Sequence, residues 1–116
     1  MNIGILTSGG LCPGLNTVIK TLTIKEMQKN NFVYGFKNGF KGLNDCDYIN
    51  LNENTHLLCD NGGCILSTSR VQLCIQKSQE SIKNTALSKL YSIGGNGTLC
   101  ASKILSENSN INIIGI

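Results

Sequence analysis

A glycine-rich loop between a short apolar run and a helical stripe constrains the fold of this chain more than any other feature. The run NIGIL, residues 2–6, is typical of a β-strand, and the loop TSGGLCPG, residues 7–14, follows it directly. Apolar residues then recur at the i, i+3, i+4 and i+7 positions of one helix face: Leu15, Val18, Ile19 and Leu22. This spacing predicts a helix to about Lys29 and, with the strand and loop before it, the first half of a βαβ unit.

A second loop repeats this order near the other end of the chain. Leu90–Ile93 is an expected strand, GGNGT at residues 94–98 is the loop, and Thr98–Leu105 is an expected helix. In both loops glycine lets backbone N–H groups approach a ligand, and the helix N-terminus that follows offers free donors and the positive end of its dipole. Phosphate is the natural ligand of such a turn, although a tight turn without a ligand has the same pattern.

The remaining pattern completes an alternation of strands and helices. Residues 32–36 (FVYGF) and 111–116 are expected strands, and apolar residues predict a helix from Val71 to Leu90, interrupted only by Ser78. Residues 38–61 are loop-rich, and we assign no element to them. Short apolar strands that alternate with helices predict a Rossmann-like α/β fold, in which a parallel sheet carries helices on both faces. We expect a single domain over residues 1–116.

Composition limits the class of protein. Hydrophobic residues make up 41% and charged residues 15%, as in an ordinary globular protein. The net charge of +3 is mild and not gathered into a stripe, which fits a site for small anions and does not argue for nucleic acid. No basic leader and no apolar stretch of about 18 residues is present, so we expect neither a signal peptide nor a membrane span, and a cytoplasmic location.

Six cysteines raise the question of disulfides or a metal. Without a secretory signal they are expected to be reduced thiols. Cys59 and Cys64 lie five residues apart with His56 nearby, which loosely suggests zinc. No second pair completes a four-ligand site, and thiols without a metal are the favoured interpretation.

The common nucleotide-binding motifs do not explain the glycine loops. The chain has no GxxxxGK[ST] motif of the P-loop NTPases and no GxGxxG fingerprint of the dinucleotide-binding folds. No acidic residue follows the second strand in the way that the dinucleotide-binding pattern requires.

Four stretches together resemble the phosphofructokinase family. They are LTSGGLCPGLNTVI at 6–19, YGFKNGFKGL at 34–43, GGCILSTSR at 62–70 and IGGNGT at 93–98. They occur in the family's order and span nearly the whole chain, and the wording GGLCPG is closer to plant, protist and pyrophosphate-dependent members. The resemblance implies an enzyme of glycolysis, a homo-oligomer that uses MgATP to phosphorylate fructose 6-phosphate at its 1-hydroxyl.

The resemblance also implies an ATP half-site made of Gly10, Arg70, Val71, Gly95, Asn96, Gly97 and Thr98. The Gly10 amide would lie against the phosphates, and Arg70 would supply a planar cation with Val71 beside it. The turn from Gly95 to Thr98 would wrap the phosphates and the magnesium ion. Glycine at position 97 leaves room for a nucleotide where pyrophosphate-dependent members carry aspartate, so this turn favours ATP.

Asn96 departs from the commonest family pattern, which has aspartate. A carboxylate holds magnesium with a charge, whereas an amide offers only a neutral oxygen. This difference puts direct metal ligation by Asn96 in doubt. Lys20, at a position where some members contact an effector, is expected to be an ordinary helix-surface lysine.

The resemblance implies a chain that is incomplete relative to the family fold. The catalytic base of the family is an aspartate in a TIDND-like loop, which would follow the strand that here ends in IIGI. We therefore expect an N-terminal portion that binds nucleotide and does not catalyse transfer alone. Two alternatives stay open: a short non-catalytic relic or regulatory partner, and the NAD kinase or diacylglycerol kinase group, which shares the GGDG turn. The TSGGxxPG motif speaks against the latter.

Overall fold

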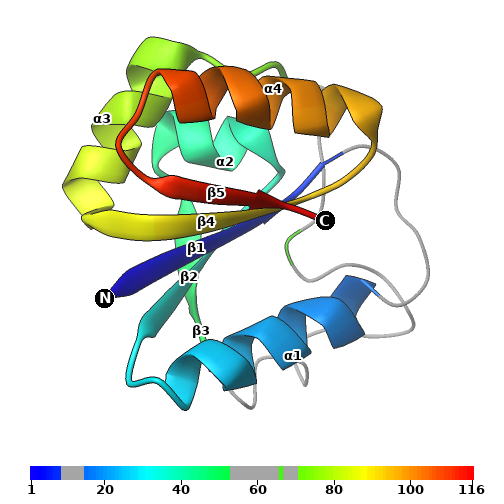
Figure 1. The fold of residues 1–116 in the computed structure, drawn as a ribbon, viewed down its shortest axis with the longest axis vertical. Coiled ribbons are helices and arrows are strands. Elements are labelled where there is room, and N and C mark those ends of the chain that lie inside the picture. Colours follow the sequence, from blue (N-terminus) through cyan, green and yellow to red (C-terminus); the bar gives the residue numbers. More distant parts are fainter. Residues whose placement is uncertain (9–14, 53–65, 67–70) are drawn as a thin grey trace.

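The computed structural model describes residues 1–8, 15–52, 66 and 71–116 of the chain. Its elements follow in this order: β1 (Asn2–Thr7), α1 (Leu15–Met27), β2 (Phe32–Phe36), α2 (Phe40–Asp45), β3 (Tyr48–Leu51), α3 (Ile75–Thr85), β4 (Leu87–Ile93), α4 (Asn96–Glu107) and β5 (Asn112–Gly115). The strands form one sheet in the order β3-β2-β1-β4-β5. Helix α1 covers one face of this sheet, and α2, α3 and α4 cover the other (Figure 1).

The sheet is mostly parallel, as predicted. Strand β1 pairs in parallel with β2 and β4, and β4 pairs in parallel with β5. The exception is β3, which runs antiparallel to β2 at one edge. After β1 the chain turns to one side of the sheet, and after β4 it turns to the other. The adjacent ends of β1 and β4 therefore form the point at which ligands bind in open α/β sheets.

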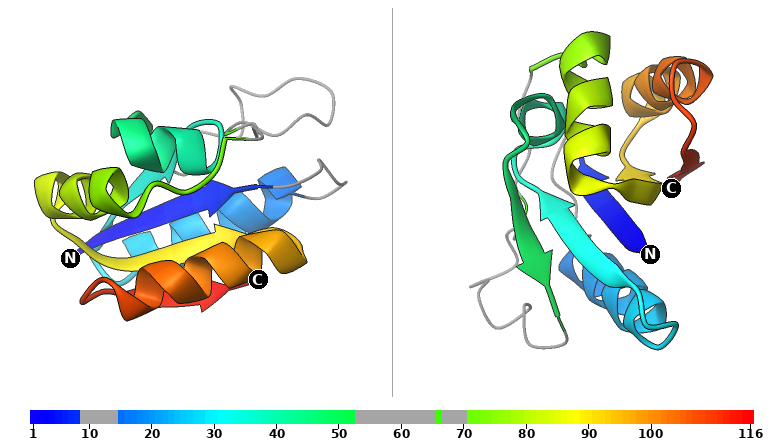
Figure 2. Two further views of the ribbon diagram at one scale, coloured as in Figure 1. Left: turned by 90° about the horizontal axis from the view of Figure 1, so that it is seen from above. Right: turned by 90° about the vertical axis from the view of Figure 1, so that its left-hand side faces the viewer.

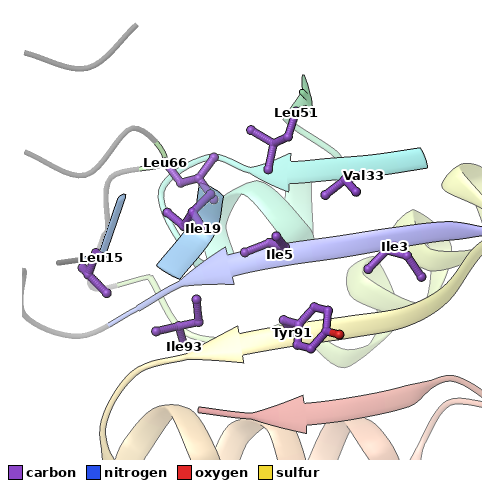
Figure 3. Close-up of a cluster of buried hydrophobic side chains, with 9 residues drawn as sticks. All are labelled: Ile3, Ile5, Leu15, Ile19, Val33, Leu51, Leu66, Tyr91 and Ile93. Atoms are coloured by element: carbon purple, nitrogen blue, oxygen red, sulfur yellow. The ribbon is translucent and has the colours of Figure 1, made fainter. Parts of the chain in front are cut away.

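The α1 face of the sheet holds a compact apolar cluster. Its members come from β1, β2, β3, β4 and α1, together with Leu66: Ile3, Ile5, Leu15, Ile19, Val33, Leu51, Leu66, Tyr91 and Ile93 (Figure 3). Leu66 is completely buried and contacts the sheet over Gly35, where a Cβ atom would collide with its side chain. The predicted stripe of α1 is thus confirmed in part, since Leu15 and Ile19 are buried and Val18 and Leu22 pack at the margin.

The prediction of one helix from Val71 to Leu90 was wrong at both ends. Helix α3 begins at Ile75 and ends at Thr85, because Ala86 adopts a left-handed conformation and donates its N–H to the Ile82 and Lys83 carbonyls. The chain then enters β4, in which the register with β1 shifts between Leu87 and Lys89. This bulge puts Leu87 and Leu90 in the same buried cluster although they are three residues apart, a spacing that imitates a helix face.

Residues 38–61, for which no element was predicted, contain α2 and β3. The glycines of this stretch had the appearance of a loop, but they have packing roles. Gly39 has φ +63° and precedes α2, and a Cβ atom at Gly42 would collide with the Lys37 carbonyl. Helix α2 packs against α3 on the same side of the sheet (Figure 2).

A polar network is buried beneath the last turn of α1. The Glu26 carboxylate is completely buried and accepts hydrogen bonds from Lys89 Nζ (2.7 Å), Tyr91 Oη (2.8 Å) and Asn31 Nδ2 (2.9 Å). Burial alone would raise the pKa of Glu26, but the hydrogen bonds from Lys89, Asn31 and Tyr91 outweigh it and lower that pKa to about 2. The hydrogen bond to Glu26 raises the pKa of Lys89, against the opposing effect of burial. The network ties α1 to β4 near the beginning of the strand.

Candidate functional site

The two glycine loops begin side by side at one edge of the sheet. The Ser8 N–H, just after β1, donates to the Ile93 carbonyl at the end of β4 (2.9 Å). A Cβ atom at Gly94 would lie 2.6 Å from the Ser8 carbonyl oxygen and 2.5 Å from Thr98 Oγ1. Gly94 is therefore required by the close approach of the two loops.

Helix α4 points its N-terminus at this junction. Its N-cap is Gly95, in an extended conformation (φ −88°, ψ −160°), so no side chain caps the first turn. The first N–H groups of a helix have no partner within it, and they carry the positive end of the dipole. Cβ atoms at Gly95 or Gly97 would meet no described atom within 4 Å. The described part of this turn thus leaves open space at the Cβ positions of both glycines.

A pocket of about 640 Å³ opens at this place. One part of its described lining is apolar: Phe40, Val71, Leu73, Ile75, Ala101 and Ile104. The other part contains the loop ends, the first turns of α4 and one polar side chain of the loop before α3: Ser8, Gly95, Gly97, Thr98, Cys100 and Gln72. No charged side chain lies among these described lining residues. The pocket thus combines an apolar wall with backbone donors, a combination that suits a ligand with an apolar ring and an anionic group.

The structure brings four of the residues that the resemblance implies to this pocket: Val71, Gly95, Gly97 and Thr98. Asn96 is exposed at the first position of α4 and is not among the described lining residues. Gly10 and Arg70 lie outside the described residues. Their roles stay predictions.

Sequence reasoning missed most of the apolar wall. Phe40 belongs to α2, which was not predicted, and Leu73 and Ile75 lie where a continuous helix was expected. On α4 a signal was present. Gly97, Cys100, Ala101 and Ile104 recur at the spacing of one helix face, and all of them line the pocket.

The described residues do not form a dedicated magnesium site. No carboxylate lies in the described pocket lining, and Asn96 offers a neutral amide oxygen. No group of three or more His, Cys, Asp or Glu side chains that could hold a metal occurs in the part of the chain that the structure describes. The zinc alternative of Cys59, Cys64 and His56 falls outside that part. Cys46, Cys74 and Cys100, which the structure does describe, are free thiols.

The described residues define a doubly wound α/β domain with a pocket at its switch point. Comparison with known proteins gives the family: the phosphofructokinase sequence model matches residues 2–116. The chain belongs to the phosphofructokinase family. The NAD kinase and diacylglycerol kinase alternative is thereby set aside.

Curated relatives and solved structures are similar over the whole chain. It is 37% identical to ATP-dependent 6-phosphofructokinase 3 of Streptomyces coelicolor, covering 100% of this chain and 36% of that protein. It is 34% identical to ATP-dependent 6-phosphofructokinase of Aquifex aeolicus, covering 100% and 38%. The fold matches Pichia pastoris phosphofructokinase in the T-state with a TM-score of 0.84 and 22% identity, over 99% of this chain and 15% of that one. The chain spans little more than a third of these curated relatives.

No helix of the described residues is long and apolar enough to cross a membrane.

Proposed function

We propose that this chain is the N-terminal, ATP-binding part of an ATP-dependent 6-phosphofructokinase, which transfers a phosphoryl group from MgATP to fructose 6-phosphate in glycolysis. Family membership and the names of the curated relatives support the reaction class. The complete enzyme would be a cytoplasmic homo-oligomer. The resemblance of GGLCPG to plant and protist members stays a prediction, as does the assignment of Gly10 and Arg70 to phosphate binding.

The pocket supplies the observation that carries the proposal. Apolar side chains and the uncapped N-terminus of α4 line one cavity. The N–H groups of the turn would orient the phosphates, and the wall would pack against the nucleotide ring and exclude water. Pyrophosphate has no group for such a wall to contact. ATP therefore fits this pocket better than pyrophosphate does.

The described residues provide binding and orientation, not a base. The described pocket lining contains no Asp, Glu, His or Lys that could accept the proton of a sugar hydroxyl. A base after β5, in a segment beyond Ile116, is what the resemblance implies. We expect the 116-residue chain to bind MgATP and to form no fructose bisphosphate by itself.

A non-catalytic nucleotide-binding or regulatory homologue is the second candidate. It is compatible with the described pocket lining, which contains no Asp, Glu, His or Lys side chain. Coupled assays with fructose 6-phosphate and either ATP or pyrophosphate separate the candidates when applied to the native protein from its source. Product formed with ATP supports the enzyme, and absence of product with retained ATP binding supports the non-catalytic homologue.

The direct test of the binding site is calorimetric titration of the 116-residue chain with MgATP and with magnesium pyrophosphate. Gly97→Asp should weaken MgATP binding more than about tenfold, because a carboxylate then occupies the open space above the turn and repels the phosphates. Its thermal unfolding should change little, since no described atom lies within 4 Å of a Cβ there.

Leu99→Asp is the matched control. It adds the same charge two residues away on α4, at an exposed side chain that is not among the described pocket-lining residues. MgATP affinity should stay within about twofold of wild type, because exposed charges outside the pocket are screened by salt. Equal weakening by both variants, or tight pyrophosphate binding by the wild-type chain without any ATP binding, would contradict the proposal.

A further inference from the structure

Asn44, in the last turn of α2, makes two hydrogen bonds to the segment that leads into α3 and one to α3 itself. Its side-chain Nδ2 donates to the Gln72 carbonyl at 2.8 Å. Its Oδ1 accepts from the Cys74 backbone N–H at 2.8 Å and from Ser78 Oγ at 3.0 Å. One amide side chain thus joins α2 to residues 28 to 34 positions further along the chain.

These bonds replace the secondary structure that the segment lacks. Residues 71–74 form neither helix nor strand. Asn44 gives residues 72 and 74 the donor and acceptor that a neighbouring strand would supply. Cys74 is the N-cap of α3, and its own side chain makes no capping hydrogen bond. Ser78, which broke the apolar stripe in the sequence, is completely buried and points its hydroxyl to Asn44.

The segment that Asn44 holds supplies part of the pocket lining, including three residues of its apolar wall. Val71, Gln72, Leu73 and Ile75 all line the cavity, and Val71 is 44% exposed. Helix α2 is itself fixed at the end of β1, because a Cβ at Gly39 would lie 2.8 Å from the Thr7 carbonyl oxygen. The hydrogen bonds of Asn44 therefore connect residues 72 and 74, through α2, to the edge of the sheet where the glycine loops begin.

We propose that Asn44 is a positioning residue for the nucleotide pocket: its three hydrogen bonds hold residues 71–75 at the distance from the α4 N-terminus at which a nucleotide ring fits. This inference deepens the proposed function and rests on it. Asn44 does not line the pocket, so it acts through the wall and not through contact with the ligand.

The test measures MgATP affinity by calorimetry in Asn44→Ala, at a temperature well below its unfolding transition. The dissociation constant should rise about tenfold, since a mobile wall must be ordered again on binding. Asp45→Ala is the matched control, because Asp45 is the exposed neighbour on α2 and forms an ion pair with Lys41, on the same helix. Asn31→Ala is a stability reference, because it removes a hydrogen bond on the far side of the sheet. Both references should bind MgATP as wild type does.

Amide hydrogen exchange of the free protein gives an independent readout. Residues 72–78 should exchange about tenfold faster in Asn44→Ala and at the wild-type rate in Asn31→Ala. If Asn44→Ala does not fold, the pair Ser78→Ala and Ser81→Ala replaces it. Both serines are buried on α3, but only the Ser78 hydroxyl bonds to Asn44, so only Ser78→Ala should weaken binding, about threefold.

The outcomes separate this inference from the proposed function. If the wild-type chain binds MgATP and Asn44→Ala binds it equally well, the positioning role is overturned and the proposed function stays intact. The same holds if Asn44→Ala loses no more MgATP affinity than Asn31→Ala does. No MgATP binding by the wild-type chain, with faster exchange in Asn44→Ala, overturns the nucleotide site and supports the control of the segment by Asn44. Unchanged exchange overturns the inference whatever the nucleotide does.

Discussion

Polar groups near the two ends of β4 differ in whether they have hydrogen-bond partners within the protein. At its beginning the Glu26 carboxylate is completely buried and accepts three side-chain hydrogen bonds, from Lys89, Tyr91 and Asn31. At its end the Gly95 turn has no capping side chain and opens on a pocket. The first arrangement is closed and stabilises the contact of α1 with the sheet. The second leaves donors for a ligand.

The contrast separates stability from binding within one strand. A buried charge is tolerated only when its partners are in place, so the Glu26 network is rigid and costly to disturb. A ligand site needs donors without internal partners, and glycine provides them at little cost in packing. Changes at the two ends should therefore affect different measurements, and four predictions test this separation.

The largest effect is expected from Glu26→Gln. It leaves the Lys89 ammonium, which is 19% exposed, without its counter-charge, and breaking a buried pair costs about 3–5 kcal/mol. The free energy of unfolding, measured in urea, should fall by roughly this amount. The double variant with Lys89→Met should recover part of the loss. A MgATP affinity that falls in proportion to stability would show that the two ends are not separate.

Lowering the pH should remove nearly the same contribution of Glu26 to the free energy of unfolding. The pKa of Glu26 is about 2 in the folded chain against an ordinary 4.5, so its stabilising effect is present above pH 4.5 and is lost as the pH falls toward 2. The loss should approach roughly 3 kcal/mol, from the 1.36 kcal/mol that one pKa unit represents. Urea unfolding between pH 6 and about pH 2 measures it, with Glu26→Gln as the control that lacks this slope. Equal slopes in both proteins would refute the assignment.

Gly94→Ala, at the end of β4 beside the glycine loops, should lower the stability of the protein less than Glu26→Gln does. Its Cβ would lie 2.6 Å from the Ser8 carbonyl and 2.5 Å from Thr98 Oγ1, and such overpacking costs about 1–3 kcal/mol. MgATP binding should weaken as well, because the two loops must move apart. Gly97→Ala is the matched control, since no described atom lies within 4 Å of its Cβ and alanine is favourable inside a helix. Equal thermal stability of the two variants would contradict this account of the junction.

The smallest effect is expected from Asn96→Asp. A negative charge at the first position of α4 should stabilise the helix by about 0.3–1 kcal/mol. If the side chain faces the magnesium ion of MgATP, the new carboxylate should tighten MgATP binding severalfold. Calorimetry with MgATP and with ATP in excess EDTA distinguishes the two effects. Unchanged MgATP affinity would exclude metal contact at this position.

Much of the fold could be predicted because local periodicity and burial agree there. The strand at residues 32–36, the helix from Leu15 and the second glycine turn followed by α4 were predicted within two residues of the observed bounds. The errors have physical causes outside local pattern. The predicted helical stripe continued past Ala86, where a left-handed conformation ends α3. The glycines around α2 serve close packing, not a loop.

Residues of the candidate site could be predicted only where they belong to one sequence motif. Gly95, Gly97 and Thr98 stand in one short turn, so their proximity needs no knowledge of the fold. Phe40 and Asn44 act on the pocket from α2, which no sequence pattern had placed beside α3. Their contribution depends on contacts across about 30 residues of chain.

The sequence by itself determined the alternation of strands and helices, the two glycine turns and the resemblance to a family, because each follows from local spacing. Only the tertiary structure decided that Glu26 is buried with Lys89, that Ser78 is a buried hydrogen-bond donor, and that Asn44 holds the pocket wall. A polar residue in a sequence does not indicate whether it faces water or a partner. That depends on which distant segment packs against it, and burial then makes the hydrogen bond necessary.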